Sequence, residues 1–328
     1  MIRLSRRQTL SMIALGSALP ASLHAQSPAW PARPIRIVVP FPPGGATDIS
    51  ARLIAEHLSR RLGQSAVVEN RPGGSTVIGV DAVAKAPADG YTLLVAGGGS
   101  YSVLPALRRD LPFDIGRDFT PVSLIASAPV VVVAPASSPH RSLAELISAA
   151  RAQPGRLRYA SYGPGSAPHL AAEMLNHAAG IDLQPIAYKG ASETSLALLR
   201  GEVDLGFETF AASNAMIKAD KLRVLAHNGA QRTSFLPDTP GMKELGLEQA
   251  ANEAFYGMMA PAGTPTDIVG RLSSEIASIL ALPEVRERLT ALFLESTPPG
   301  PQAMSAMIQR EFIKYQAVVQ RARIQPQS

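Results

Sequence analysis

The 328-residue chain has no cysteine, a single tryptophan and a charged-residue content of only 17%. The lack of cysteine excludes disulfides, thiolate metal sites and cysteine nucleophiles, and it leaves the redox compartment open. The sequence also lacks a Walker motif, a Gly-x-Ser-x-Gly elbow, a His-Glu-x-x-His motif and any cluster of residues at metal-ligand spacing. We therefore expect neither a metal nor a cofactor.

Basic residues give little indication of a nucleic-acid partner. The formal net charge is +5, but Arg3, Arg6 and Arg7 supply three of these charges near the N-terminus, where no acid occurs, so the rest of the chain carries +2. The remaining basic residues are spread along the chain with little aromatic interleaving. We therefore expect no binding to nucleic acid.

The first 25 residues have the pattern of an export signal. Paired arginines, Arg6 and Arg7, precede a modest apolar run at 12–19 and a small-residue end at Ala25. This order resembles a twin-arginine leader, with Thr9 where an aromatic residue is more usual. The alternative is a short membrane anchor, but neither this run nor any later one reaches the ~20 apolar residues that span a bilayer. The pattern predicts a signal peptide over residues 1–25, a periplasmic location and no stable membrane insertion.

What the chain does contain is 46% hydrophobic residues, which is typical of a globular protein with a core. Apolar strand patterns at 35–39, 66–69 and 91–96 alternate with helical patterns at 49–62 and 77–85. The repeated order of strand, helix and strand indicates parallel βαβ units. We therefore predict an α/β fold.

The segment Pro42–Asp48 follows the first strand and opens the first helix. Its two prolines stiffen the entry, and Gly44 and Gly45 let the backbone turn without Cβ clashes. A helix N-terminus carries unpaired N–H donors and about half a unit of positive charge, so it attracts anions. Thr47 or Asp48 is expected to cap the helix. The local pattern fits an anion site or an ordinary strand–turn–helix.

A second turn of this kind lies at 163–169, after a predicted strand at 157–161. Ser166 offers a hydroxyl at the helix start, and His169 lies in the first helical turn, where it is either a ligand contact or a surface or capping residue. The glycine-rich segment 97–100 also follows a strand directly. Ligands of open α/β sheets bind at the carboxyl ends of strands, so this segment is a candidate site as well as a candidate flexible loop.

The segment 34–48, PIRIVVPFPPGGATD, closely resembles the signature of the extracytoplasmic solute receptors of tripartite tricarboxylate transporters, the large Bug family described from Bordetella. Further similar segments follow in order across the chain. They are VENRPG at 68–73, AVAKAP at 82–87, DGYTLL at 89–94, GSAPHL at 165–170, YKG at 188–190, GEVDL at 201–205 and APAGTP at 260–265.

This resemblance implies a periplasmic binding protein-like fold of type II, in which two βαβ lobes are joined by a hinge and enclose a ligand cleft. The first lobe would comprise residues 34–128 and a return segment with C-terminal helices, 253–328, and the second lobe would comprise 129–252. The implied function is that of a monomeric, non-enzymatic receptor. It would bind a small organic anion, usually a carboxylate, and deliver it to the membrane subunits of a tripartite tricarboxylate-type transporter.

The resemblance also implies which loops hold the ligand. The loop ending at Asp48 would grip one carboxylate, largely through backbone groups and ordered water, and the segment 97–100 would contribute from the same lobe. Three further turns would close from the other lobe. The implied ligand-binding residues are Pro43, Gly44, Gly45, Ala46, Thr47, Asp48, Gly98, Gly99, Ser100, Gly165, Ser166, His169, Tyr188, Lys189, Glu208 and Thr209.

Three departures from the family pattern concern the ligand. The pair Glu208-Thr209 stands where the family commonly has Asp-Asn, and the longer carboxylate would change the size and charge of the cleft. Phe255 stands where a tryptophan is frequent, and Ser75–Val77 replaces a glycine-rich turn. These departures leave the identity of the ligand open.

Two other functions stay open at this point. The same cleft would serve a sensor that signals to a membrane two-component kinase. A serine-dependent hydrolase using Ser100 or Ser166 is the other alternative, although no base–acid partner for either serine is recognisable in the sequence.

Overall fold

The computed structural model describes residues 30–189, 191–322 and 324, and the predicted signal peptide lies outside these residues. Residues 1–32 and residues 33–328 form separate structural units, and the architecture below is that of the second unit. Across the described residues, no helix combines the length and the apolarity that crossing a membrane requires.

The strands form two mixed sheets, of which the first has the order β11-β4-β10-β3-β1-β2. Its strands are β1 (Ile35–Val39), β2 (Ala66–Asn70), β3 (Thr92–Gly97), β4 (Phe119–Ala128), β10 (Ala254–Pro261) and β11 (Glu295–Ser296). β1 is parallel to β2 and β3, whereas β10 is antiparallel to β3 and β4. A strand from the last third of the chain therefore completes a sheet that begins at Ile35.

The second sheet has the order β7-β6-β8-β5-β9. Its strands are β5 (Val130–Pro135), β6 (Arg158–Ser161), β7 (Gln184–Ala187), β8 (Leu205–Thr209) and β9 (Leu222–His227). β6 is parallel to β7 and β8, and β5 is antiparallel to β8 and β9. Both sheets thus share one plan. Three mutually parallel strands lie side by side, the next strand is antiparallel to them, and the strand after it is antiparallel to that one.

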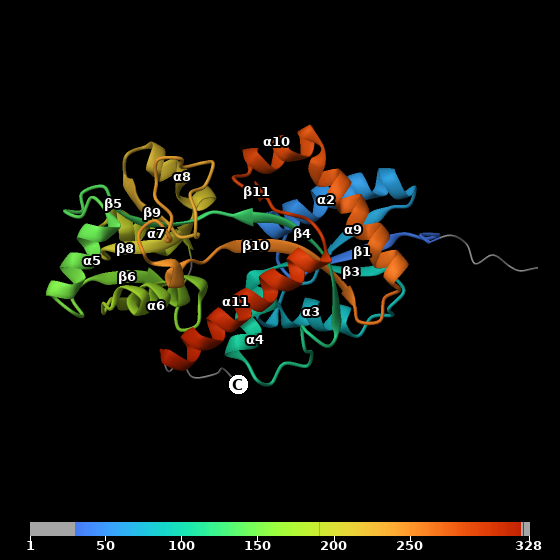
Figure 1. The fold of residues 1–328 in the computed structure, drawn as a ribbon, viewed down its shortest axis with the longest axis horizontal. Coiled ribbons are helices and arrows are strands. Elements are labelled where there is room, and N and C mark those ends of the chain that lie inside the picture. The colour runs from blue at the N-terminus through green and yellow to red at the C-terminus, as the bar shows by residue number, and fades with distance from the viewer. Residues whose placement is uncertain (1–29, 190, 323, 325–328) are drawn as a thin grey trace, which may run out of the picture. The chain divides into compact units, whose positions relative to one another are not determined.

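Helices surround both sheets (Figure 1). The first lobe, as the term is used below, is the first sheet with α2 (Ala46–Leu62), α3 (Val77–Ala84), α4 (Leu104–Leu107), α9 (Thr266–Ala281) and α10 (Pro283–Ala291). The second lobe is the second sheet with α5 (Leu143–Ala152), α6 (Ala167–Ala179), α7 (Ala191–Leu199) and α8 (Phe210–Lys218). Short helical turns lie at η1 (Gly74–Thr76), η2 (Gly99–Val103, a π-helical turn) and η3 (Glu248–Ala250), and the last helix is α11 (Pro301–Arg321).

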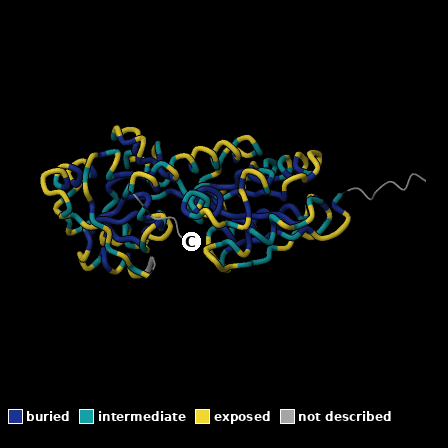
Figure 2. Tube along the Cα trace, turned by 90° about the horizontal axis from the view of Figure 1, so that it is seen from below, coloured by how far each residue is buried: buried dark blue, intermediate teal, exposed yellow. Residues whose placement is uncertain are grey.

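The chain passes between the lobes where strands follow one another closely. β4 ends at Ala128, and β5 begins in the other sheet only two residues later, at Val130. The return runs from β9 to β10. α11 links the lobes as well, because Met304 packs into the first-lobe core while Tyr315 and Val318 pack into the second-lobe core. Figure 2 shows the buried residues inside each lobe and the exposed ones on the outer helices and turns.

The predicted α/β class is correct, but the sequence patterns missed β4, α4, α8 and β11. β4 contains Pro121, which weakens a strand pattern, and its main partner β10 lies more than a hundred residues away. α8 begins at Phe210, directly after the last residue of β8, so no loop marks its start. The predicted parallel βαβ units are present in both sheets, and β5 and β10 in addition run antiparallel to their neighbours.

Candidate functional site

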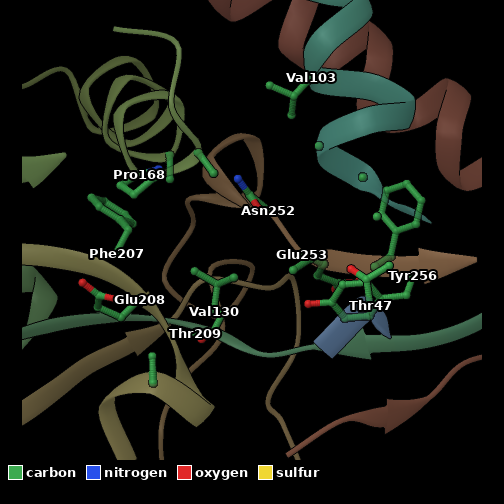
Figure 3. Close-up of a pocket in the computed structure, with 18 of the residues that line it drawn as sticks. Thr47, Val103, Val130, Pro168, Phe207, Glu208, Thr209, Asn252, Glu253 and Tyr256 are labelled. Atoms are coloured by element: carbon green, nitrogen blue, oxygen red, sulfur yellow. The ribbon is translucent and has the colours of Figure 1, made fainter. Parts of the chain in front are cut away.

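A cavity of about 350 Å³ is lined by residues of both lobes. Figure 3 shows labelled side chains around it from the start of α2 (Thr47), from β8 (Phe207, Glu208 and Thr209), and from the return segment that leads into β10 (Asn252 and Glu253). Its walls are mainly apolar and aromatic. The aromatic residues among them are Phe41, Tyr162, Phe207, Phe255, Tyr256 and Tyr315.

The first-lobe part of the site is the turn between β1 and α2. Gly44 has a φ of 89°, a left-handed conformation that glycine adopts without strain, and Gly45 is the N-cap residue. No side chain caps the helix, so the expectation that Thr47 or Asp48 would do so was wrong. The amides of the first turn therefore lack helical partners. Thr47 lines the cavity, whereas Pro43, Gly44, Gly45 and Ala46 form the turn beside it.

Asp48 stabilises this turn from inside. Its side chain is 2% exposed, and Oδ2 accepts hydrogen bonds from the Gly44 N–H at 2.9 Å and from Arg52 Nε at 3.0 Å. Oδ1 accepts from Asn70 Nδ2 at 2.9 Å, and the same nitrogen donates to the Phe41 carbonyl at 3.0 Å. Both oxygens of the carboxylate thus accept hydrogen bonds, from the turn, from α2 and from β2. Asp48 positions the loop and is not among the residues that line the cavity.

The electrostatics of Asp48 agree with this role. Burial alone would raise the pKa of its carboxyl group, but the hydrogen bonds from Arg52, Gly44 and Asn70 together outweigh burial and hold the pKa below its usual value. The group is therefore a carboxylate at neutral pH. It anchors the N–H of Gly44 and leaves the amides of the α2 first turn for other partners.

The segment after β3 forms a second part of the first-lobe wall. Gly98 and Gly99 line the cavity, and the chain continues as the π-helical turn η2, so the alternative of a flexible loop does not apply. A Cβ atom on Gly98 would lie 2.6 Å from the Phe255 ring, so a side chain there would require the ring or the backbone to shift. Ser100 is fully buried, is not among the lining residues, and its hydroxyl has no hydrogen-bond partner among the described residues.

The second-lobe turn before α6 has the same construction as the turn before α2. Gly165 has a φ of 77°, Ser166 is the N-cap, and the Gly165 N–H donates to His169 Nδ1 at 3.0 Å. In both lobes, the side chain of the third helical residue, Asp48 or His169, accepts a hydrogen bond from the backbone N–H of the residue before the N-cap. Because burial lowers the pKa of His169, the neutral acceptor form is favoured. Ala167 and Pro168 line the cavity, whereas Gly165, Ser166 and His169 support the turn behind it.

Glu208 and Thr209 line the cavity at the end of β8. The Glu208 side chain is 4% exposed, and its Oε1 accepts a hydrogen bond from Thr194 Oγ1 at 3.0 Å. Burial raises the pKa of this carboxyl group, and the bond from Thr194 offsets only part of the effect. Thr209 is the N-cap of α8, so a third helix start adjoins the cavity.

Tyr188 and Lys189 are not among the residues that line the cavity. The Tyr188 hydroxyl donates to Glu202 Oε2 at 3.4 Å, and the Lys189 amide donates to Glu193 Oε2 at 3.0 Å. Lys189 is exposed. The structure therefore brings Thr47, Gly98, Gly99, Glu208 and Thr209 together at the cavity and places these two residues elsewhere.

Sequence reasoning missed several lining residues, among them Val103, Asn252, Glu253, Tyr256 and Tyr315. Three of these belong to the return segment and β10, and Tyr315 comes from α11. A usable signal existed at the return segment, where an aromatic pair, Phe255 and Tyr256, stands in a strand pattern. No local pattern marks Tyr315 as a cavity residue, because its position depends on how α11 packs.

Two mixed α/β sheets of the same plan, with a cavity lined from both, define a periplasmic binding protein fold. Comparison with known proteins identifies the family. Residues 50–324 match the profile of the tripartite tricarboxylate transporter family receptor, and the chain belongs to this family. It is a solute-binding receptor and not an enzyme, which removes the serine hydrolase alternative.

The most informative relatives cover almost the whole chain. A protein from Pseudomonas sp. strain P51, described as a UPF0065 protein in the tcbD-tcbE intergenic region, is 37% identical over 317 residues, which are 96% of this chain and 94% of the relative. The structure of R. palustris Rpa4515 with adipate is 35% identical, with a TM-score of 0.76, and covers 91% of this chain and all of that one. MatC (Rpa3494) from Rhodopseudomonas palustris with bound malate is 31% identical, with a TM-score of 0.71 and coverages of 88% and 99%.

Proposed function

We propose that this chain is a periplasmic receptor that captures a small carboxylate in the cavity between its lobes and delivers it to the membrane subunits of a tripartite tricarboxylate-type transporter. Membership of the receptor family supports the transport role. Two relatives whose structures are described with adipate and with malate support a carboxylate ligand. The mature receptor begins after the signal peptide at residues 1–25 and acts as a monomer.

One observation carries the carboxylate assignment. The described residues that line the cavity include no lysine, arginine or histidine. The turn before α2, however, presents Thr47 and the helix N-terminus to the cavity, and no side chain caps the amides there. A carboxylate bound here is held by backbone N–H groups, the Thr47 hydroxyl and ordered water. Three or four such bonds, at ~1.5–3 kcal/mol each, support micromolar affinity after the entropy costs of binding.

The rest of the cavity wall determines which kind of group fits between the polar ends of the ligand. Phe41, Phe207 and Phe255 are among the aromatic groups that line it, and they favour a hydrocarbon chain or ring between the polar ends of the ligand. Binding draws together the first lobe, residues 34–128 and 253–328, and the second lobe, residues 129–252. The hinge lies where the chain passes between the sheets, since few residues there need to change conformation.

The first experiment identifies the ligand and tests its class. Protein lacking residues 1–25 is purified without added acids, and small molecules released on denaturation are identified by mass spectrometry. Calorimetry with linear mono- and dicarboxylates of three to eight carbons then measures binding, with the primary amide of each acid as the uncharged control. We expect one-to-one binding of at least one acid and none of its fully amidated form.

Two results would refute the assignment. Equal affinity for an acid and its neutral amide would show that the α2 turn does not recognise charge. Absence of binding to every acid of the series, combined with release of a ligand that has no carboxylate, would place the protein in another ligand class.

A further inference from the structure

The charges around the cavity are unusual for a site proposed to bind an anion. Two acidic side chains, Glu208 and Glu253, line the cavity, and no basic side chain does so among the described residues. Apart from backbone dipoles, the fixed charge at the wall is therefore negative. A ligand bearing a second carboxylate would bring that group into this field.

Glu253 is the less constrained of the two acids. It precedes β10, in the return segment between the lobes, and Figure 3 shows it among the central residues of the site. Its carboxylate has no hydrogen-bond or ion-pair partner among the described residues, and it is partly exposed. Glu253 also borders a smaller hollow that His227 and Arg232 line. An unpaired carboxylate at a partly desolvated wall repels another carboxylate and accepts hydrogen bonds from a donor.

Glu208 is enclosed more tightly. Thr194 Oγ1 donates a hydrogen bond to Glu208 Oε1, and the described residues make no other hydrogen bond to this carboxyl group. Burial raises the pKa of Glu208 above the usual value of a glutamate, and the hydrogen bond from Thr194 offsets only part of this effect.

Amide donors for an anion lie at helix starts in both lobes. The first turn of α2 contains Ala46, Thr47 and Asp48, each with a backbone N–H, and no acidic side chain of this turn lines the cavity. In the second lobe, Pro168 removes one donor from the first turn of α6, and Glu208 directly precedes Thr209, the N-cap of α8. The first lobe is therefore the better place for one carboxylate, because a second carboxylate at the second-lobe helix starts would lie close to Glu208.

We infer that the cavity selects ligands with a single carboxylate and a far end that donates hydrogen bonds and carries no negative charge, and that Glu253 and Glu208 reject dicarboxylates. The inference rests on the proposed carboxylate-binding function and specifies its substrate class. It separates this receptor from the two relatives described with adipate and with malate, both of which are dicarboxylates.

The test uses pairs of ligands that have the same shape and differ in charge. Adipate and its half-amide, adipamate, have the same number of heavy atoms, but adipamate carries one negative charge and an amide donor. The corresponding succinate and glutarate pairs cover shorter chains. Calorimetry at pH 7.5 on the protein lacking residues 1–25 gives Kd for each member, and the length that binds most tightly is used for the variants.

In the unaltered protein, we expect the half-amide to bind at least about tenfold more tightly than the diacid, since like charges in close contact cost a factor of this order or more. Glu253→Gln should reduce this ratio to within about threefold, mainly by strengthening diacid binding. Glu208→Gln, which keeps the shape of the buried side chain, should also reduce this ratio. Glu287→Gln, on an exposed position of α10, removes one negative charge away from the cavity and should leave the ratio unchanged.

Each outcome has a distinct meaning. A diacid that binds as tightly as its half-amide, or a ratio unchanged in both Glu253→Gln and Glu208→Gln, overturns the inference while the carboxylate-binding function stands. Failure of every diacid, every half-amide and every monocarboxylate of the first experiment to bind, combined with release of a ligand that has no carboxylate, overturns the proposed function and this inference with it. Thermal melting of each variant shows whether a changed ratio reflects charge rather than loss of structure.

Discussion

Asp48 holds the shape of the turn before α2, although its side chain does not line the cavity. Its carboxylate holds Gly44, Arg52 and Asn70, and through Asn70 it also fixes the Phe41 carbonyl. These bonds set the direction of the α2 first turn at the cavity. In the proposed site, amides and a hydroxyl recognise the ligand, and the charged residue acts behind them.

We predict that Asp48→Asn lowers ligand affinity at least about tenfold and lowers the free energy of unfolding by about 1–3 kcal/mol. The amide keeps the shape of the carboxylate, but its nitrogen cannot accept, so either Gly44 and Arg52 or Asn70 loses its hydrogen-bond acceptor. Calorimetry measures the affinity and urea unfolding the stability.

Glu56→Gln is the matched control for this prediction. Glu56 lies on the same helix in an exposed ion pair with Arg60, and such pairs contribute little to stability. Both quantities should stay close to those of the unaltered protein. If Asp48→Asn behaved like Glu56→Gln, the loop would not depend on the Asp48 network.

The junction of β3 with η2 packs closely against β10. β3 is buried throughout and ends at Gly97, and Gly98 then passes against the Phe255 ring of β10. A Cβ atom added to the neighbouring Gly99 would meet no other part of the protein within 4 Å. Adjacent glycines in one wall of the cavity thus face different steric constraints.

We predict that Gly98→Ala lowers the free energy of unfolding by about 1–3 kcal/mol, because the added methyl group displaces the Phe255 ring or the β3 end. Gly99→Ala is the matched control, and it should change stability by less than ~0.5 kcal/mol. Urea unfolding of the two variants distinguishes them. Equal stability losses would mean that the Gly98–Phe255 contact does not constrain this wall.

The elements that sequence patterns identified are those determined by neighbours in the chain. The helix after Gly45 ends at Leu62, followed by Gly63 with a φ of 68°, and all of these features are local. β4 was missed because pairing with β10 and burial stabilise it despite Pro121. For the site, the turns before α2 and α6 were recognisable, whereas the contributions of Asn252 and Tyr315 depend on the return segment and on α11, whose packing no local pattern reveals.

The two lobes contact each other away from the ligand cavity as well. Phe293, which follows α10, packs with Phe210 and Phe235 of the second lobe. Glu295 of β11 accepts hydrogen bonds from Thr233 Oγ1 at 2.6 Å and from the Ser234 N–H at 3.0 Å. Together with α11, these contacts give the lobes a defined packing in addition to the two chain passages. The lobe closure proposed above would therefore have to rearrange or preserve the aromatic cluster and the Glu295 hydrogen bonds.

The crystal structure of the receptor lacking residues 1–25, in complex with its tightest-binding acid, tests the central claim most directly. We expect a carboxylate within about 3.2 Å of the Thr47 hydroxyl or of first-turn amides of α2, with the rest of the ligand in contact with both lobes. A carboxylate held instead by a lysine or arginine side chain outside this cavity, with the α2 turn unoccupied, would contradict it.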